Sequence, residues 1–189
     1  MKRNQTEEHQ ELAKRCLTWA AARATGRGIR GATEVRLDEG YQADAMVIGS
    51  FQWRWQEAML GAPRMERIEG TLCAIVPEVV CVFEVKVSRA DFLSTFGPSD
   101  KHANRREPVA TLHYIVTPQR LVSPDELPGF WGLLEKCGAG LREAKAAEPQ
   151  EVSDEEYNKR ACQILWALTP WRQRAGEAVV CPAVREEGA

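Results

Sequence analysis

The sequence contains no apolar run of the roughly 18 residues that a membrane-spanning helix requires. Residues 1–10 are polar and charged, and no apolar segment of an export signal follows them. These absences predict a cytoplasmic protein that makes no membrane contact.

The paired CxxC spacing of zinc sites and redox centres is also missing. The six cysteines are scattered, and several stand in apolar stretches, where a thiol behaves as a small hydrophobe. We expect reduced thiols rather than a zinc or disulfide framework, in agreement with a cytoplasmic location.

An excess of charge of one sign is absent as well, because the formal net charge is −2. The whole-molecule field therefore gives no argument for nucleic-acid binding, which would need a local basic patch. The sequence has no internal repeat and no low-complexity segment. Its 189 residues suffice for one hydrophobic core, so we predict a single domain over residues 1–189.

Hydrophobic patterning in the first half predicts a helix followed by strands. An apolar stripe at steps of three and four indicates a helix over residues 7–24. Residues 33–37 and 43–49 are β-type runs around the turn-like Asp38-Glu39-Gly40, which favours a hairpin. Residues 78–87 form a β-branched run, apolar on both faces as in a covered central strand.

The second half completes an α/β pattern. Residues 51–77 lack clean periodicity and are interpreted as an insertion. A helical stretch broken at Gly97-Pro98 is expected between residues 88 and 108. Strands are expected at 111–117, 130–134 and 140–144. A C-terminal helix is expected at 154–168, and it starts with a capping box from Ser153 and Glu156. This order predicts a central mixed β-sheet flanked by helices.

Two charges interrupt the apolar strand at 78–87. Glu84 and Lys86 stand two residues apart, so their side chains point the same way. Burying an isolated charge costs roughly several kcal/mol, and both therefore need partners. Asp44, set between Ala43 and Ala45 on a neighbouring predicted strand, is the expected third member.

These residue types suit a divalent metal. Neighbouring strands lie about 4.8 Å apart, so an aspartate and a glutamate that face the same way can share one cation. Asp44, Glu84 and the backbone carbonyl of Val85 are hard oxygen donors that suit Mg²⁺ or Mn²⁺. Such an ion would polarise a phosphodiester and acidify a bound water, while Lys86 assists the attack. The pattern predicts metal-assisted phosphodiester hydrolysis.

At this point a family resemblance becomes specific. Ala43-Asp44-Ala45 followed by Glu84-Val85-Lys86 resembles the signature of the PD-(D/E)XK nucleases. The insertion at 51–77 accounts for much of the distance between the two carboxylates, and Ala43 replaces a proline that does no chemistry. The block from Phe83 to Phe92, with Asp100-Lys101 and Gly132-Leu133-Leu134 downstream, is similar to MmcB-like bacterial DNA-repair nucleases over residues 9–146.

The resemblance implies a restriction-endonuclease-like fold and a metal-dependent DNA nuclease of repair or recombination. It implies Asp44 and Glu84 as metal ligands and Lys86 as the catalytic lysine. Many members carry a further glutamate on the first helix, for which Glu8 and Glu11 are the candidates. Cutting both strands of a duplex would favour a homodimer.

Four basic residues that follow the site are candidates to hold DNA phosphates, although a solvated helix face explains them nearly as well. They are Arg89, Lys101, Arg105 and Arg106. Glu34 and Arg36 either extend the site or form a surface pair, and we favour the pair. We expect no catalytic role for His102 or His113, and packing rather than base stacking for Trp53 and Trp55.

Two other functions remain open at this stage. The first is a DNA-binding or partner-binding module that keeps the nuclease fold without cutting. The second is an enzyme that acts on RNA or on a nucleotide, since the same site would serve it.

Overall fold

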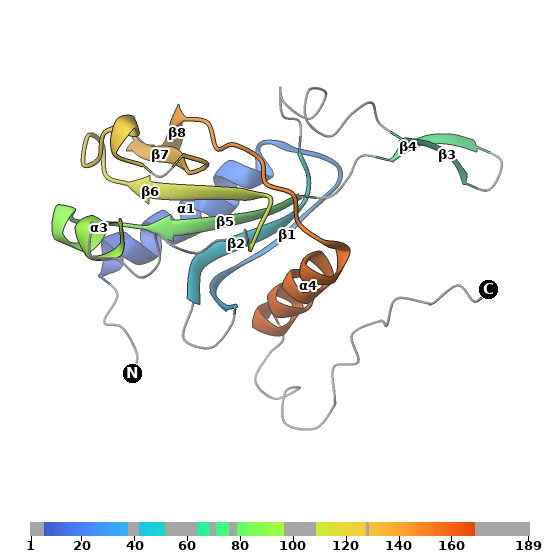
Figure 1. The fold of residues 1–189 in the computed structure, drawn as a ribbon, viewed down its shortest axis with the longest axis horizontal. Coiled ribbons are helices and arrows are strands. Elements are labelled where there is room, and N and C mark those ends of the chain that lie inside the picture. The colour runs from blue at the N-terminus through green and yellow to red at the C-terminus, as the bar shows by residue number, and fades with distance from the viewer. Residues whose placement is uncertain are drawn as a thin grey trace.

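The computed structural model describes residues 6–37, 42–51, 64–68, 71–75, 79–96, 109–127 and 129–168. Helices flank a six-stranded mixed sheet of order β1-β2-β5-β6-β7-β8 (Figure 1), which confirms the α/β prediction. The helical elements are α1 (Glu7–Ala21), α3 (Arg89–Phe96), the 3-10 turn η1 (Pro124–Glu126) and α4 (Asp154–Leu168). The strands are β1 (Ala24–Arg36), β2 (Gln42–Phe51), β3 (Arg64–Ile68), β4 (Thr71–Ile75), β5 (Val79–Val85), β6 (Leu112–Thr117), β7 (Gly132–Cys137) and β8 (Gly140–Lys145).

Helix α1 begins at a capped N-terminus and covers one face of the sheet. The Thr6 side chain accepts a hydrogen bond from the His9 N–H at 3.2 Å. Leu12, Cys16 and Trp19 then face the sheet, as their spacing predicts. The helix ends at Ala21, earlier than predicted, because the glycines that follow weaken a helix and β1 begins at Ala24.

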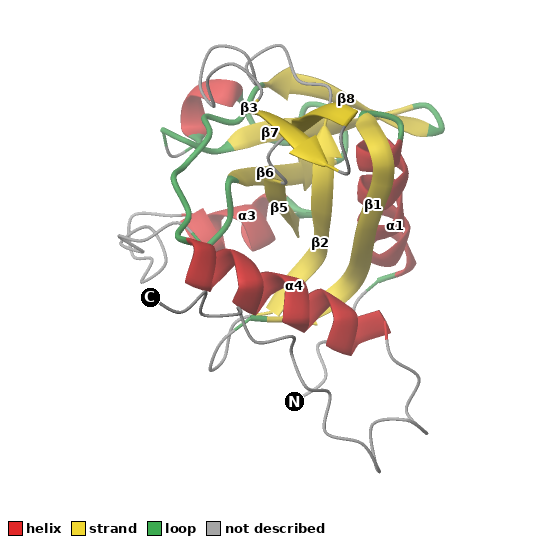
Figure 2. Ribbon diagram, turned by 90° about the vertical axis from the view of Figure 1, so that its right-hand side faces the viewer, coloured by secondary structure: helices red, strands yellow, loops and turns green. Residues whose placement is uncertain are grey.

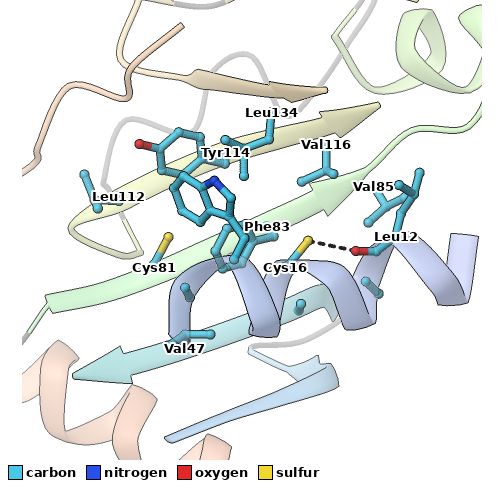
Figure 3. Close-up of a cluster of buried hydrophobic side chains, with 14 of the residues drawn as sticks. Leu12, Cys16, Val47, Cys81, Phe83, Val85, Leu112, Tyr114, Val116 and Leu134 are labelled. Atoms are coloured by element: carbon cyan, nitrogen blue, oxygen red, sulfur yellow. Dashed lines mark hydrogen bonds between the residues drawn. The ribbon is translucent and has the colours of Figure 1, made fainter. Parts of the chain in front are cut away.

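The core beneath α1 is built around three aromatic rings (Figure 3). Trp19 meets Tyr114 edge-on, with 5.3 Å between ring centroids, and Phe83 at 6.1 Å. Phe83 and Tyr114 stack on neighbouring strands. Aromatic pairs contribute about 0.5–1.5 kcal/mol beyond their burial, so this cluster ties α1 to β5 and β6.

Helices α3 and α4 cover the opposite face (Figure 2). Ile164 of α4 packs with Val80 and Val82 of β5, and Phe92 of α3 packs with Ile115 and other residues of the same face. Strand β5 is consequently buried on both sides along its whole length, which confirms it as the central strand. It pairs antiparallel with β2 and parallel with β6.

The predicted β1–β2 hairpin is confirmed, and both strands are longer than predicted. The C-terminal helix is confirmed over residues 154–168. Ser153 accepts the Glu156 N–H at 3.2 Å, but the Glu156 carboxylate pairs with Arg160 rather than completing a reciprocal box. Within the insertion, β3 and β4 form an antiparallel hairpin that the sequence did not predict. Trp53 and Trp55 lie outside the described residues.

The cysteines correct one expectation. Cys16, Cys81 and Cys137 are free thiols, as expected. Cys162 of α4 is disulfide-bonded, so the expectation of reduced thiols throughout is wrong for this residue. Separately, none of the helices in the described ranges combines the length and apolar character needed to cross a bilayer.

Candidate functional site

The fold brings the predicted catalytic residues to the carboxyl end of β5. Strands β5, β6 and β7 run parallel, so their carboxyl ends meet at one edge of the sheet. Glu84 and Lys86 stand at this edge, and Asp44 of β2 lies one step beyond the last paired residues, Ala45 and Phe83. The three charged residues are only 2–4% exposed. Burial of three charges at one edge demands compensating contacts.

Lys86 finds its compensation in two carboxylates. Its Nζ lies 3.8 Å from Glu84 Oε2 and 3.9 Å from Asp91 Oδ1. Asp91 stands in the first turn of α3, where its N–H donates to the Ser88 hydroxyl at 3.1 Å. The Lys86 N–H donates to the Val116 carbonyl at 2.9 Å, so the backbone stays in the ladder. The cation is therefore held from two sides.

Asp44 is held by a backbone group and by α1. Its Oδ2 accepts the Val85 N–H at 2.8 Å, and its Oδ1 lies 3.3 Å from His9 Nε2. Val85 is the residue between Glu84 and Lys86, so this hydrogen bond joins the two halves of the predicted constellation. His9 was not among the candidates, although its spacing to Leu12 placed it on the buried face of the helix.

A break in strand alternation turns Asp44 towards α1. Ala43 packs beneath α4 and Ala45 beneath α1, whereas residues two apart in a regular strand point the same way. Glu34, between the β1 residues that pair with Ala43 and Ala45, has the left-handed φ of 57°. The irregularity in both strands therefore lies at one position. Glu84 projects with Lys86 to the α3 face, so the expectation that the Asp44 and Glu84 carboxylates face the same way is wrong. They approach the end of β5 from opposite faces of the sheet.

Glu34 does not extend the site, because it is exposed. Arg36 is exposed as well, and these two described residues form no ion pair, so the expected surface pair is not found. The contribution of Glu34 to the site is through the backbone of the hairpin. Without the left-handed residue, regular alternation would give Asp44 a different direction.

The donors at this edge fit a hard divalent cation in chemical type. Each Asp44 oxygen makes one contact and retains a second lone pair. In a β-strand, the N–H and C=O groups of one residue point to the same neighbouring strand, as the paired bonds of an antiparallel ladder show. The Val85 carbonyl thus points to the side where Asp44 lies. Mg²⁺ needs only one or two carboxylates and retains waters. Across the described ranges, no three His, Cys, Asp or Glu side chains form a ready metal-binding group.

The two helix glutamates do not reach Asp44. Glu8 and Glu11 lie 3.6 Å and 3.4 Å from the Lys136 ammonium, measured from their nearest carboxylate oxygens. Both side chains are nearly half exposed. The contact from α1 to Asp44 comes instead from His9.

Of the predicted phosphate-binding residues, only Arg89 lies within the described part of the chain. Lys101, Arg105 and Arg106 lie outside the described residues, and so does His102. Arg89 begins α3, three residues beyond Lys86, and pairs with Glu126 of η1. His113 is a core residue against Phe130 and Trp131. Burial, aided by the Arg160 charge, lowers its pKa to about 4.

Comparison with known proteins supports the architecture alone. The chain matches no known family model and no curated protein. It is similar in structure to the SPO1766 protein of unknown function from Silicibacter pomeroyi, with a TM-score of 0.52 and 17% sequence identity. The similarity covers 93% of this chain and 98% of that protein. At 17% identity, this similarity shows a shared fold alone.

Proposed function

We propose that this protein is a metal-dependent DNA nuclease of the PD-(D/E)XK type, with a restriction-endonuclease-like core, acting in DNA repair or recombination. The observation that carries the proposal is the 2.8 Å hydrogen bond from the Val85 N–H to Asp44 Oδ2. It joins the aspartate of one strand to the Glu84-Val85-Lys86 triplet of the next. The resemblance of both segments to the nuclease signature supports the same assignment.

In this proposal Asp44, Glu84 and the Val85 carbonyl hold Mg²⁺ or Mn²⁺. When bound, the ion supplies polarisation of the phosphodiester and a more acidic water. Lys86 places its ammonium beside the reacting phosphate, where it stabilises developing negative charge and orients the water. Asp91 and Glu84 position that ammonium, since they contact it already. His9 and the Val85 N–H keep Asp44 in one orientation.

The test is cleavage of duplex, single-stranded, flapped and branched DNA with Mg²⁺, Mn²⁺ or EDTA. We expect metal-dependent cleavage by the native chain and none by Asp44→Ala or Lys86→Ala. Glu155→Gln removes an exposed carboxylate of α4 and serves as the control that retains cleavage. Matched RNA substrates test the alternative of an RNA-acting enzyme. Cleavage that persists in both site variants would refute the proposed assignment.

One observation favours a second candidate, a DNA-binding or partner-binding module that retains the fold without cutting. Lys86 is 2% exposed and lies between two carboxylates, so its charge is already engaged. A purely structural ion-pair cluster has the same features. Calorimetric titration with Mg²⁺ or Mn²⁺ separates the two candidates. A heat of metal binding that the native chain shows and Asp44→Asn lacks supports the nuclease. DNA binding without metal binding or cleavage supports the module.

A further inference from the structure

A groove of about 640 Å³ lies at the same sheet edge as the candidate site. Arg89 of α3, the loop after β6, and strands β7 and β8 line it. Three arginines and three glutamates stand along its walls: Arg89, Arg120, Arg142, Glu126, Glu135 and Glu143. Of these six residues, the sequence pattern predicted a phosphate contact for Arg89 alone. The formal charges balance, and two of the arginines are paired within the groove, Arg89 with Glu126 and Arg142 with Glu135.

The carboxylates on the β7 and β8 walls are held by the protein. Glu135 is 5% exposed, accepts the Arg120 N–H at 2.8 Å and pairs with Arg142. Glu143 accepts the Tyr114 hydroxyl at 2.6 Å. The Arg142 side chain, by contrast, is 58% exposed. On these walls the Arg120 and Arg142 side chains are therefore exposed, while Glu135 and Glu143 are engaged by the protein.

Arg120 is the residue that a purely structural role explains least. Its φ of 61° is a left-handed conformation that a residue with a side chain adopts at an energetic cost, and glycine would adopt it freely. The conformation directs its backbone N–H to the buried Glu135. Within the described part of the chain, its guanidinium has no hydrogen-bond or ion-pair partner. The fold thus tolerates strain at a residue whose charge the protein itself does not use.

The groove is connected to the candidate site across the parallel strands. Glu135 pairs in register with Thr117, and Lys86 bonds to Val116, the residue before Thr117. Among the described residues, the buried Thr117 hydroxyl between them has no hydrogen-bond partner. Arg89 stands three residues beyond Lys86 on the other side of the groove. The groove and Lys86 therefore lie at the same carboxyl end of the parallel strands.

We propose that this groove binds the sugar-phosphate backbone of the nucleic acid on one side of the reacting phosphate, with Arg120 as its principal phosphate contact. The inference rests on the proposed function for the location of that phosphate. Arginine suits the role, because its planar guanidinium offers two parallel donors to phosphate oxygens. Backbone contacts of this kind carry affinity without sequence preference.

Fluorescence anisotropy with short labelled single-stranded DNA, duplex DNA and RNA of one sequence tests the groove. EDTA is present, so no cleavage contributes to the signal. Arg120→Gly removes the charge and the backbone strain together, and Arg120→Gln removes the charge alone. We expect both to weaken binding about fivefold at low salt and to reduce the salt slope by about one for duplex. Denaturant unfolding should show Arg120→Gly to be at least as stable as the native chain.

Two controls separate a local contact from a loss of net charge. Arg120→Lys retains a cation without the two parallel donors and should recover part of the binding that Arg120→Gln loses. Arg30→Gln removes one exposed charge from β1, the outermost strand on the side of the sheet away from β8, and should leave binding unchanged. Native-level binding by both neutral Arg120 variants, equal weakening by Arg30→Gln, or no binding of any nucleic acid by the native chain would overturn the inference.

The outcomes for the groove and for the nuclease are distinguishable. Weaker binding by the Arg120 variants, in a native chain that cuts nothing with any metal, would support the groove and reject the nuclease. Metal-dependent cleavage, with binding indifferent to Arg120, would support the nuclease and reject the groove. The relative loss on single-stranded DNA, duplex and RNA identifies which backbone the groove fits.

Discussion

The Asp44 carboxylate takes the place of a backbone acceptor at the end of the β2–β5 ladder. Backbone pairing ends with Ala45 opposite Phe83, and Asp44 Oδ2 then accepts the Val85 N–H at 2.8 Å. A backbone donor cannot rotate away, so this bond fixes the carboxylate more firmly than a side-chain partner would. It also compensates a buried N–H that has passed the end of the regular pairing.

His9 is expected to act as a positioning residue for Asp44. In His9→Ala the Asp44 Oδ1 loses its contact at 3.3 Å, while the Val85 bond remains. Loss of an outer-shell partner typically costs about 10–100-fold in metal affinity or activity, so we expect a decrease of about tenfold in cleavage rate and in Mg²⁺ affinity. Single-turnover kinetics and calorimetry measure the two quantities.

His9→Gln, which keeps a donor, should recover part of both quantities. Gln10→Ala alters an exposed neighbour on the same helix and should change neither. If the decrease in cleavage rate and Mg²⁺ affinity of His9→Ala disappears once both are corrected for the fraction of folded protein, the residue serves folding alone.

Lys86 and Glu84 are expected to be coupled in stability. Lys86→Met removes a buried cation that contacts Glu84 at 3.8 Å and should lower the free energy of unfolding by about 3 kcal/mol. Glu84→Gln/Lys86→Met should cost less than the sum of the single changes. Urea unfolding of the four chains measures the coupling. Additive losses within about 0.5 kcal/mol would contradict it.

Asp91→Asn provides the comparison for the second carboxylate. The Asp91 side chain is 38% exposed and lies 3.9 Å from the ammonium, so water screens this pair. We expect a loss below about 1 kcal/mol. A larger loss would show that α3, rather than Glu84, is the main support of Lys86.

The stability of the fold should fall in mild acid because of His113. Burial lowers its pKa to about 4 in the folded chain, against 6.5 for an exposed imidazole. Stability is therefore intact above pH 6.5, decreases as pH falls towards 4, and loses about 3 kcal/mol from this residue in all. Urea unfolding across this range measures the slope. His113→Leu should flatten it, and an unchanged slope would assign the acid sensitivity to other groups.

Gly132 is expected to tolerate no side chain. A Cβ there would lie 2.4 Å from Tyr114 Cε1 and 2.6 Å from the Ala147 backbone nitrogen. Because one of the neighbours is backbone, Gly132→Ala should lower the free energy of unfolding by at least about 2 kcal/mol. Gly129→Ala, with nothing within 4 Å of the new atom, is the matched control and should be nearly neutral. Equal melting of the two variants would refute the steric argument.

The arrangement of the main elements was predictable because periodicity reports burial. The run at 78–87 was apolar on both faces, and β5 is the central strand. The stripe ending before Pro170 gave the bounds of α4 correctly. Element ends were less predictable, since α1 gives way to β1 where glycines weaken a helix but do not specify a strand.

The placement of Asp44, Glu84 and Lys86 at one end of β5 was predictable for a similar reason, but a common facing was not found, because Asp44 turns to α1 while Glu84 and Lys86 turn to α3. Charges that interrupt buried strands need partners, and two neighbouring strands offered only a few. The contact from His9 was not predicted, because a histidine on an apolar helix face is compatible with ordinary core packing. Asp91 stood in the family-like block, but only the capped start of α3 directs it to Lys86.

The sequence by itself determined the α/β pattern, the burial of β5 and the set of charges at its end, because these depend on local periodicity and on the cost of burying charge. Tertiary structure alone decided the direction of the Asp44 side chain and the assembly of the groove that Arg89, Arg120 and Arg142 line. The first depends on a left-handed Glu34 in a paired strand. The second depends on the pairing of β6, β7 and β8, which brings Arg120 and Arg142 beside Arg89 of α3. Pairing between strands distant in sequence fixes both, and no local pattern encodes it.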